Sequence, residues 1–170
     1  IAECLVGSEM CIRDRQLGYL AENNPLYEEM YVKEFLLFVA NIHQLNNPQD
    51  AVDDVIGKVG LTPEKGKKIG QLSKGYQQRV GIAQAIIHDP DVLILDEPTS
   101  GLDPLQLDEI RTLIKTLGKN KTVLLSTHIM QEVESICDRI IVIKKGEIVA
   151  DQGIKDCLLY TSDAADEVRS

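Results

Sequence analysis

The sequence predicts an α/β fold in which a parallel sheet is flanked by helices. Two observations carry this prediction. Residues 92–95 form a continuous apolar run, which is typical of a central strand that is covered on both faces. From there to residue 150, strand-like and helix-like segments alternate along the chain. Strands that alternate with helices build parallel sheets with right-handed crossovers, so we expect this topology.

The composition describes an acidic chain of about one domain. It has 170 residues, with 18 Lys and Arg against 27 Asp and Glu, for a net charge of −9. This balance excludes a chain that wraps nucleic acid, because phosphate neutralisation needs clustered basic residues. Apolar residues make up 44%, enough for a packed core. The longest apolar runs fall far short of the ~18–20 residues that span a bilayer, so we expect a soluble chain.

Both ends of the chain differ from its middle. Residues 1–15 show neither helical nor strand periodicity, and residues 157–170 place a short apolar cluster before an acidic tail. Both resemble the short foreign translations that flank assembled environmental sequences, so we interpret them as a non-native leader and a non-native tail. The alternative is a pair of genuine, poorly ordered termini. The fold is expected within residues 16–156.

Helices are expected first along the chain. Residues 31–45 carry apolar side chains at the i, i+3, i+4, i+7 spacing of an amphipathic helix. A shorter helix is expected at 51–59, and a connection rich in Gly and Lys follows at 61–70. A third helix is expected at 73–88, where Asp89-Pro90 stops it.

The second half of the chain has the alternating pattern of an α/β protein. The expected elements are a strand at 92–95, a helix from Asp103-Pro104 to Gly118, a strand at 122–126, a short helix at 129–138, and a hairpin of strands 139–143 and 147–150 at the sheet edge.

Two consecutive carboxylates end the apolar run at 92–95. Asp96 and Glu97 are therefore expected at the carboxyl end of a buried strand, where ligands bind in open α/β sheets. An Asp at this position can hold Mg²⁺ on nucleotide phosphates, and a neighbouring Glu can orient the attacking water. The alternative is that both carboxylates only meet solvent or cap a helix.

Two further segments favour the nucleotide interpretation. The segment LSKGYQQR at 72–79 places Ser73 at a helix start, where free backbone N–H groups and the helix dipole favour a phosphate. The segment Ser126-Thr127-His128 ends the next expected strand. Its imidazole is therefore expected beside the strand end that carries Asp96.

With these motifs in this order, the sequence resembles the ATP-binding cassette (ABC) ATPases over residues 16–156. LSKGYQQR resembles their signature motif, VLILDE their Walker B strand, PTSGLD their D-loop and STH their switch histidine. Residues 18–22 resemble the Q-loop, with Glu22 where many members carry Gln. Lys74 and Tyr76 depart from the common LSGGQ signature. Such variants are similar to the exporter branch that pairs with ABC-2-type permeases, including the gliding-motility-associated ATPases.

The resemblance implies a role for each motif residue. The residues implied to hold the Mg²⁺ that accompanies ATP are Asp96 and Glu22, and those implied to be catalytic are Glu97 and His128. The residues implied to contact nucleotide across a head-to-tail homodimer are Ser73, Lys74, Gly75 and Asp103.

The resemblance also implies a partial P-loop NTPase fold, with a helical signature subdomain at about 27–88 and the Walker B strand, D-loop and switch histidine at about 89–143. The implied function is the ATP-binding and ATP-hydrolysing subunit of a membrane exporter, which powers a separate ABC-2-type permease. Its implied location is cytoplasmic, peripheral on the inner face of the plasma membrane. The alternative is a non-transport ABC ATPase of DNA repair or translation.

One expected motif does not occur in the sequence. The phosphate loop G-x-x-x-x-G-K-[ST] uses its backbone amides and Lys to hold the β- and γ-phosphates. The Gly-Lys pairs of this chain, which begin at Gly57, Gly66 and Gly118, are followed by Val, Lys and Asn. We therefore expect a truncated cassette that lacks this Walker A loop and the N-terminal β-subdomain, and that is inactive by itself.

Overall fold

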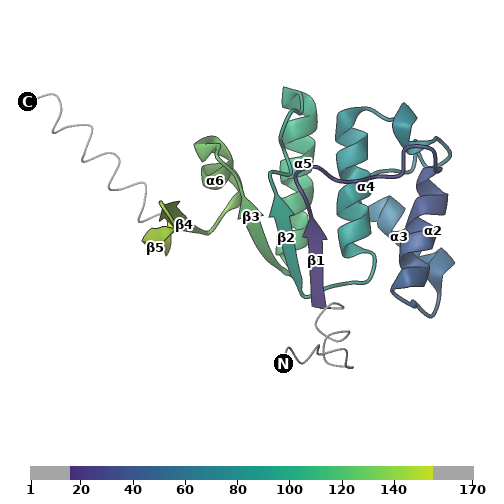
Figure 1. Cartoon of the computed structure of the whole chain (residues 1–170), viewed down its shortest axis with the longest axis horizontal. Coiled ribbons are helices and arrows are strands. Elements are labelled where there is room, and N and C mark those ends of the chain that lie inside the picture. The colour runs from purple at the N-terminus through teal and green to yellow at the C-terminus, as the bar shows by residue number, and fades with distance from the viewer. Residues whose placement is uncertain (1–15, 155–170) are drawn as a thin grey trace, which may run out of the picture. The chain divides into compact units, whose positions relative to one another are not determined.

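The computed structural model describes residues 16–154, so the predicted leader and tail lie outside the described residues. Its contacts divide the chain after Ser126 into two compact units, and each is described by itself. Figure 1 shows the order of the elements along the chain. No helix between residues 16 and 154 is long and apolar enough to cross a membrane.

A parallel three-stranded sheet forms the centre of the first unit, as the sequence predicts. Its strands are β1 (Leu17–Leu20), β2 (Val92–Asp96) and β3 (Thr122–Ser126), in the order β1-β2-β3. Leu20, Leu95 and Leu125 are register partners, as are Asp96 and Ser126. Strand β1 was not predicted, because four residues are too few to establish a period before the bend that follows them.

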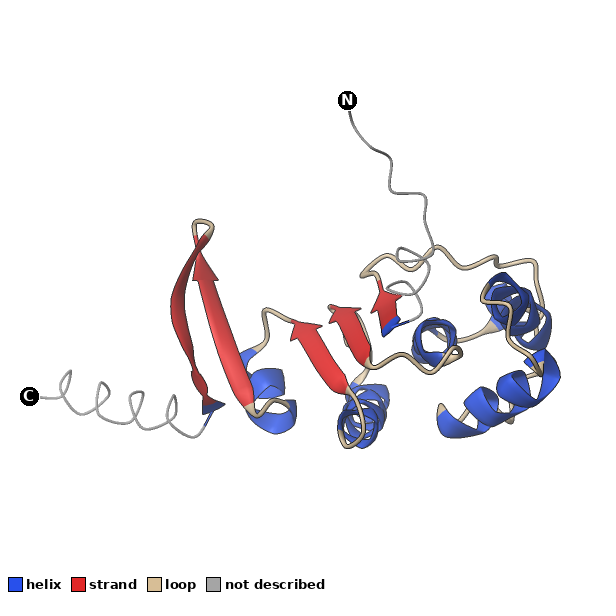
Figure 2. Ribbon diagram, turned by 90° about the horizontal axis from the view of Figure 1, so that it is seen from below, coloured by secondary structure: helices blue, strands red, loops and turns tan. Residues whose placement is uncertain are grey.

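Helices cover one face of this sheet (Figure 2). Helix α4 (Lys74–Ile86) packs on β1, and α5 (Pro104–Gly118) packs on β3 and on α4. The side chains buried between these helices and the sheet include Leu20, Leu93, Leu95, Ile110 and Ile114. On the other face the strand residues stay exposed, with Tyr19 at 57% and Leu124 at 55%. Buried and exposed side chains therefore alternate along the strands, because one face of the sheet is covered and the other is open.

Two further helices pack beside α4. Helix α2 (Val32–Ile42) buries Val32, Phe35, Leu36 and Val39 of the predicted apolar stripe, whereas Ile42 at its end is exposed. Helix α3 (Pro48–Lys58) starts three residues before the predicted helix at 51–59. The reason is that Pro48 occupies the first turn, where its fixed φ and missing N–H are tolerated. A short 3₁₀ helix, η1 (Ile69–Gln71), interrupts the predicted connection just before α4.

The second unit contains α6 (Met130–Ile136) and an antiparallel hairpin of β4 (Arg139–Lys144) and β5 (Glu147–Gly153). The turn residues Lys145 and Gly146 both have positive φ, as the tightest hairpin turns require. The hairpin is confirmed, but its predicted place at the edge of the parallel sheet is wrong. Among the described residues, β4 and β5 pair only with each other, and the third parallel strand is β1. The bidentate ion pair between Arg139 and Asp151 ties the two strands locally.

Candidate active site

The carboxyl edge of the sheet gathers the predicted acidic residues of the first unit. Asp96 ends β2, and the hydroxyl of its register partner Ser126 donates a hydrogen bond to its carboxylate. Glu22 lies exposed on the bend that follows β1. Because β1 and β2 are parallel neighbours, Glu22 and Asp96 lie at the same edge. Ser126 was not predicted to act on Asp96, although its place at the end of the next strand was visible in the sequence.

Glu97 has a strained backbone. Its φ is +46°, in the left-handed region that non-glycine residues rarely adopt. Its N–H donates to the carbonyl of Ser126 at 3.1 Å and lies 3.3 Å from the Ser126 hydroxyl, while its own carbonyl accepts from Ser100 at 3.1 Å. Strain of this kind costs on the order of 1–3 kcal/mol and persists where the surroundings enforce it, often at functional sites. These bonds turn the chain sharply between β2 and α5.

The signature segment caps α4. Ser73 is the N-cap residue, and its hydroxyl oxygen accepts from the backbone N–H of Tyr76 at 3.4 Å. Ser73 and Lys74 are exposed, whereas Gly75 is buried. The predicted helix start is confirmed, and it leaves a hydroxyl and an ammonium group at the positive end of a helix dipole.

The first turn of α5 packs against the signature segment. Asp103 is the N-cap of α5, and its carboxylate accepts from the N–H of Gln106 at 2.9 Å. The side chain of Gln106 donates from Nε2 to Ser73 Oγ at 3.4 Å. A Cβ added to Gly75 would lie 2.7 Å from Gln106 Cδ, so only glycine fits there without a shift. Gln106 was not identified from the sequence, although its position three residues after a capping Asp was an available signal.

Arg79 braces the signature helix. It donates to the carbonyl of Val59 at 2.5 Å and forms an ion pair with Glu109 of α5 at 2.7 Å. These contacts join α4 to the end of α3 and to α5. Arg79 is therefore a structural residue of the helical layer.

Thr127 and His128, the last two residues of the STH motif, belong to the second unit. The Thr127 hydroxyl donates to Glu132 at 2.8 Å and accepts from the N–H of Ile129 at 3.1 Å. Glu132 is fully buried and was not identified from the sequence. His128 is exposed between these two contacts. Its position beside Asp96 stays a prediction, because the two residues belong to different units.

The donor set at the sheet edge suits Mg²⁺. Asp96 and Glu22 offer carboxylate oxygens, the ligands that this hard cation prefers. Within residues 16–154, no group of three or more His, Cys, Asp and Glu side chains is arranged to hold a metal. Mg²⁺ in nucleotide sites needs only one or two carboxylates, because phosphates and water complete its octahedron. The residues present therefore fit a cation that arrives with a nucleotide.

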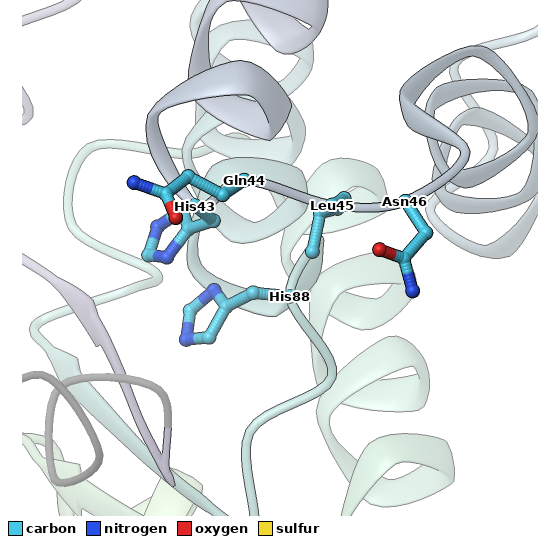
Figure 3. Close-up of a pocket in the computed structure, with 5 residues that line it drawn as sticks. All are labelled: His43, Gln44, Leu45, Asn46 and His88. Atoms are coloured by element: carbon cyan, nitrogen blue, oxygen red, sulfur yellow. The ribbon is translucent and has the colours of Figure 1, made fainter.

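A separate pocket of about 220 Å³ lies at the other end of α4 (Figure 3). It is lined by His43, Gln44, Leu45, Asn46 and His88. The two imidazole rings stack with centroids 4.0 Å apart, and His88 Nε2 donates to the carbonyl of Leu17 at 3.0 Å. Burial lowers the pKa of His88. None of the predicted site residues lines this pocket, so it is distinct from the candidate active site.

The sheet with its acidic edge and capped signature helix is the arrangement expected of an ATP-binding cassette. The profile of the ABC transporter family matches residues 3–100 of the chain. This chain belongs to the ABC transporter family. The matched range begins within residues 1–15, and the interpretation of that segment as a leader stays a prediction.

Curated relatives carry the same family description. The uncharacterized ABC transporter ATP-binding protein YdbJ of Bacillus subtilis is 41% identical over 155 residues, which cover 90% of this chain and 50% of that protein. The bacitracin transport ATP-binding protein BcrA of Bacillus licheniformis is 40% identical over 139 residues, 81% of this chain and 45% of that protein. The ABC transporter ATP-binding protein NatA of Bacillus subtilis is 36% identical over 146 residues, which cover 84% of this chain and 58% of that protein. The chain spans about half the length of the curated relatives it matches.

Proposed function

We propose that the complete protein is the ATP-hydrolysing subunit of an ABC exporter. The observation that carries this proposal is the carboxyl edge of the sheet, where Asp96 ends β2, Glu97 follows it and Glu22 lies on the bend after the parallel neighbour β1. Membership of the ABC transporter family and relatives named as transport ATP-binding proteins support it. The protein then works in the cytoplasm, against the inner face of the plasma membrane, with a separate ABC-2-type permease.

In this proposal each site residue has one task. ATP binds with Mg²⁺, for which Asp96 and Glu22 provide oxygen ligands, and the ion supplies charge neutralisation of the phosphates. Glu97 orients and polarises the attacking water. His128 contacts the terminal phosphate. The residues that reach the same nucleotide from the second copy of a head-to-tail dimer are Ser73, Lys74, Gly75 and Asp103.

An exposed aromatic patch supports the permease as partner. Tyr27 is 58% exposed and Phe38 is 45% exposed, and their rings meet edge to face with centroids 6.3 Å apart. Tyr31 and Ile42, at the two ends of α2, are also exposed. Exposed apolar patches of this kind mark surfaces that contact other proteins. We assign this patch, which follows the bend at Glu22, to the permease.

The substitution Glu97→Gln tests the proposal in the complete protein. The amide keeps the shape of the side chain but cannot act as a base, and loss of a positioned base typically lowers turnover by ~10²–10⁴. We expect ATP binding and ATP-dependent dimerisation to remain. Steady-state ATPase rates and sedimentation with ATP measure both. Full turnover in the variant would show that Glu97 is not the catalytic carboxylate.

We also propose that the 170-residue chain by itself does not hydrolyse ATP. Phosphoryl transfer depends mainly on positioning and charge neutralisation, and the sequence lacks the G-x-x-x-x-G-K-[ST] loop that positions the phosphates. The test compares phosphate release by the chain with that of its own Glu97→Gln variant. Mg²⁺-dependent release above that control would contradict the proposal.

A further inference from the structure

We propose that Gln106 is a positioning residue that commits the Ser73 hydroxyl to donate its hydrogen to an anionic oxygen. Resting on the proposed function, this inference identifies the acceptor as the terminal phosphate of the nucleotide that the second copy holds. Gln106 lies on α5, outside the signature segment, and acts through Ser73 without touching the nucleotide itself.

The Ser73 hydroxyl can form a limited number of hydrogen bonds. A serine hydroxyl has one O–H donor and two acceptor lone pairs. Ser73 Oγ accepts from the backbone N–H of Tyr76 and from Nε2 of Gln106, both at 3.4 Å. Because both lone pairs face donors, the O–H hydrogen is the part of the Ser73 hydroxyl that can still form a hydrogen bond. Since Ser73 is exposed, that hydrogen is accessible to an acceptor from outside the chain.

The backbone of Gln106 is fixed by the helix cap, and its side chain has room to reach Ser73. Its backbone N–H donates to the capping carboxylate of Asp103 at 2.9 Å, which fixes the first turn of α5. Its side-chain amide lies directly over Gly75, where any Cβ would collide with it. The absence of a side chain at Gly75 therefore leaves the space in which the Gln106 amide reaches Ser73.

The charge around the Ser73 hydroxyl also bears on the acceptor. Lys74 follows directly, its ammonium group lies over Gly101, and it is exposed. The N-terminus of α4 adds the positive end of a 13-residue helix. The carboxylate of Asp103 accepts a hydrogen bond from the Gln106 N–H. The acceptor favoured by this surface is therefore an anion such as a phosphate oxygen.

The test is Gln106→Glu in the complete protein, with Glu97→Gln in the background so that ATP is bound but not consumed. An ionised carboxylate cannot donate to Ser73 and instead accepts its hydrogen, which removes the donor from the phosphate. We expect ATP-driven dimerisation to need roughly tenfold more ATP, the usual effect of losing a hydrogen bond to a charged group. Gln106→Met, which removes the donor without adding charge, should give a smaller loss.

A double-mutant cycle with Ser73→Ala separates positioning from a general structural effect. If Gln106 acts through the hydroxyl, Gln106→Glu changes the ATP requirement by less than about twofold once Ser73 is alanine. Leu105→Glu is the charge-matched control, since Leu105 is the neighbouring residue and is 72% exposed. It should leave the ATP requirement unchanged.

Three results would overturn the inference: full additivity of the two substitutions, an equal loss in Leu105→Glu, or no loss in either Gln106 variant. Thermal melts of each variant identify a folding defect. If Gln106→Glu has such a defect, Gln106→Met replaces it in the double-mutant cycle. Failure of the proposed function looks different. If the proposed function is wrong, the protein with Gln106 and Ser73 intact would itself show no ATP-driven dimerisation.

Discussion

At the scale of single residues, Glu22 lies in the segment that resembles the Q-loop, at the position where many ABC ATPases carry an amide. It shares the sheet edge with Asp96, so two acidic residues lie at the same edge. Like charges at a phosphate site repel one another and the nucleotide unless a cation lies between them. The exposure of Glu22 is compatible with this metal role and with a position in the permease interface.

We predict that Glu22→Gln in the complete protein lowers the Mg²⁺ concentration needed for ATP binding and leaves the fold intact. The amide oxygen can still coordinate the cation, but the repulsive charge is gone. A titration of ATP binding against Mg²⁺ measures this. Glu28→Gln, the same charge change at another exposed glutamate, is the control and should have no effect. An identical Mg²⁺ dependence in Glu22→Gln and the parent would assign Glu22 to the permease interface.

A second residue-scale prediction concerns His88 and pH. Burial lowers the pKa of this imidazole below its ordinary 6.5, and the nearby Lys121 acts in the same direction. The unfolded chain therefore binds a proton at higher pH than the folded chain does. Stability is then highest above pH 6.5 and falls as the pH drops through the folded pKa.

Urea unfolding of the chain at about pH 7.5 and about pH 5.5 measures this loss. In His88→Gln, the part of the pH dependence that belongs to His88 should disappear, although the variant is expected to be less stable because the hydrogen bond to Leu17 is altered. The carboxylates with lowered pKa, such as Asp89 beside Lys121, titrate at lower pH and do not contribute in this window. An equal pH dependence in both proteins would contradict the prediction.

At the scale of elements, β1 and α4 approach closely through small residues. A Cβ on Gly18 would collide with the carbonyl of Ala85, and one on Gly81 would collide with Asn24. The contact places β1 beside β2 and so carries Glu22 to the sheet edge. The spacing between this strand and this helix is therefore a determinant of the site.

We predict that Gly18→Ala destabilises the chain by about 1–3 kcal/mol, since the backbone of α4 must move to admit the methyl group. The matched control is Gly57→Ala in α3, where an added Cβ meets nothing within 4 Å. Alanine there should raise the free energy of unfolding by about 0.5–1 kcal/mol, because it lowers the conformational entropy of the unfolded chain relative to glycine. Denaturant titrations of both variants measure the two changes in the free energy of unfolding, which should have opposite signs. An unchanged stability in Gly18→Ala would rule out the close approach of β1 and α4.

At the scale of the whole molecule, the open face of the sheet is an exposed apolar surface of the first unit. Leu17, Tyr19 and Leu124 are 44%, 57% and 55% exposed on that face. Tyr19, Ile94 and Leu124 are register partners and form one apolar row across the three strands. Contiguous apolar surface of this kind favours association.

We predict that the chain self-associates as its concentration rises, and that Tyr19→Thr combined with Leu124→Thr reduces this association. Threonine keeps the strand propensity while removing apolar area. Sedimentation velocity over a concentration series measures the effect. Leu105→Thr, which changes an exposed leucine on α5, is the control and should associate like the parent. A sharp, reversible melt that does not depend on concentration would contradict the prediction.

The sequence by itself determined the class of fold, the helix of the signature segment and the carboxylates at the end of β2. These features follow from contiguous strings of residues: an apolar run ending in Asp96-Glu97, a capping Ser73, and Asp103-Pro104 at a helix start. Each string imposes its structure through local periodicity, capping or the conformational limits of proline. Local signals of this kind need no knowledge of what lies across the fold.

Only the tertiary structure decided which distant elements meet. It paired β1 with β2, which brought Glu22 to the edge that holds Asp96, and it left the hairpin of β4 and β5 outside the parallel sheet. It also set Gln106 against Ser73, 33 residues away along the chain. Strand register and the approach of helices depend on how side chains of separate elements fill the space between them. That complementarity is a property of pairs of surfaces, so no single stretch of sequence contains it.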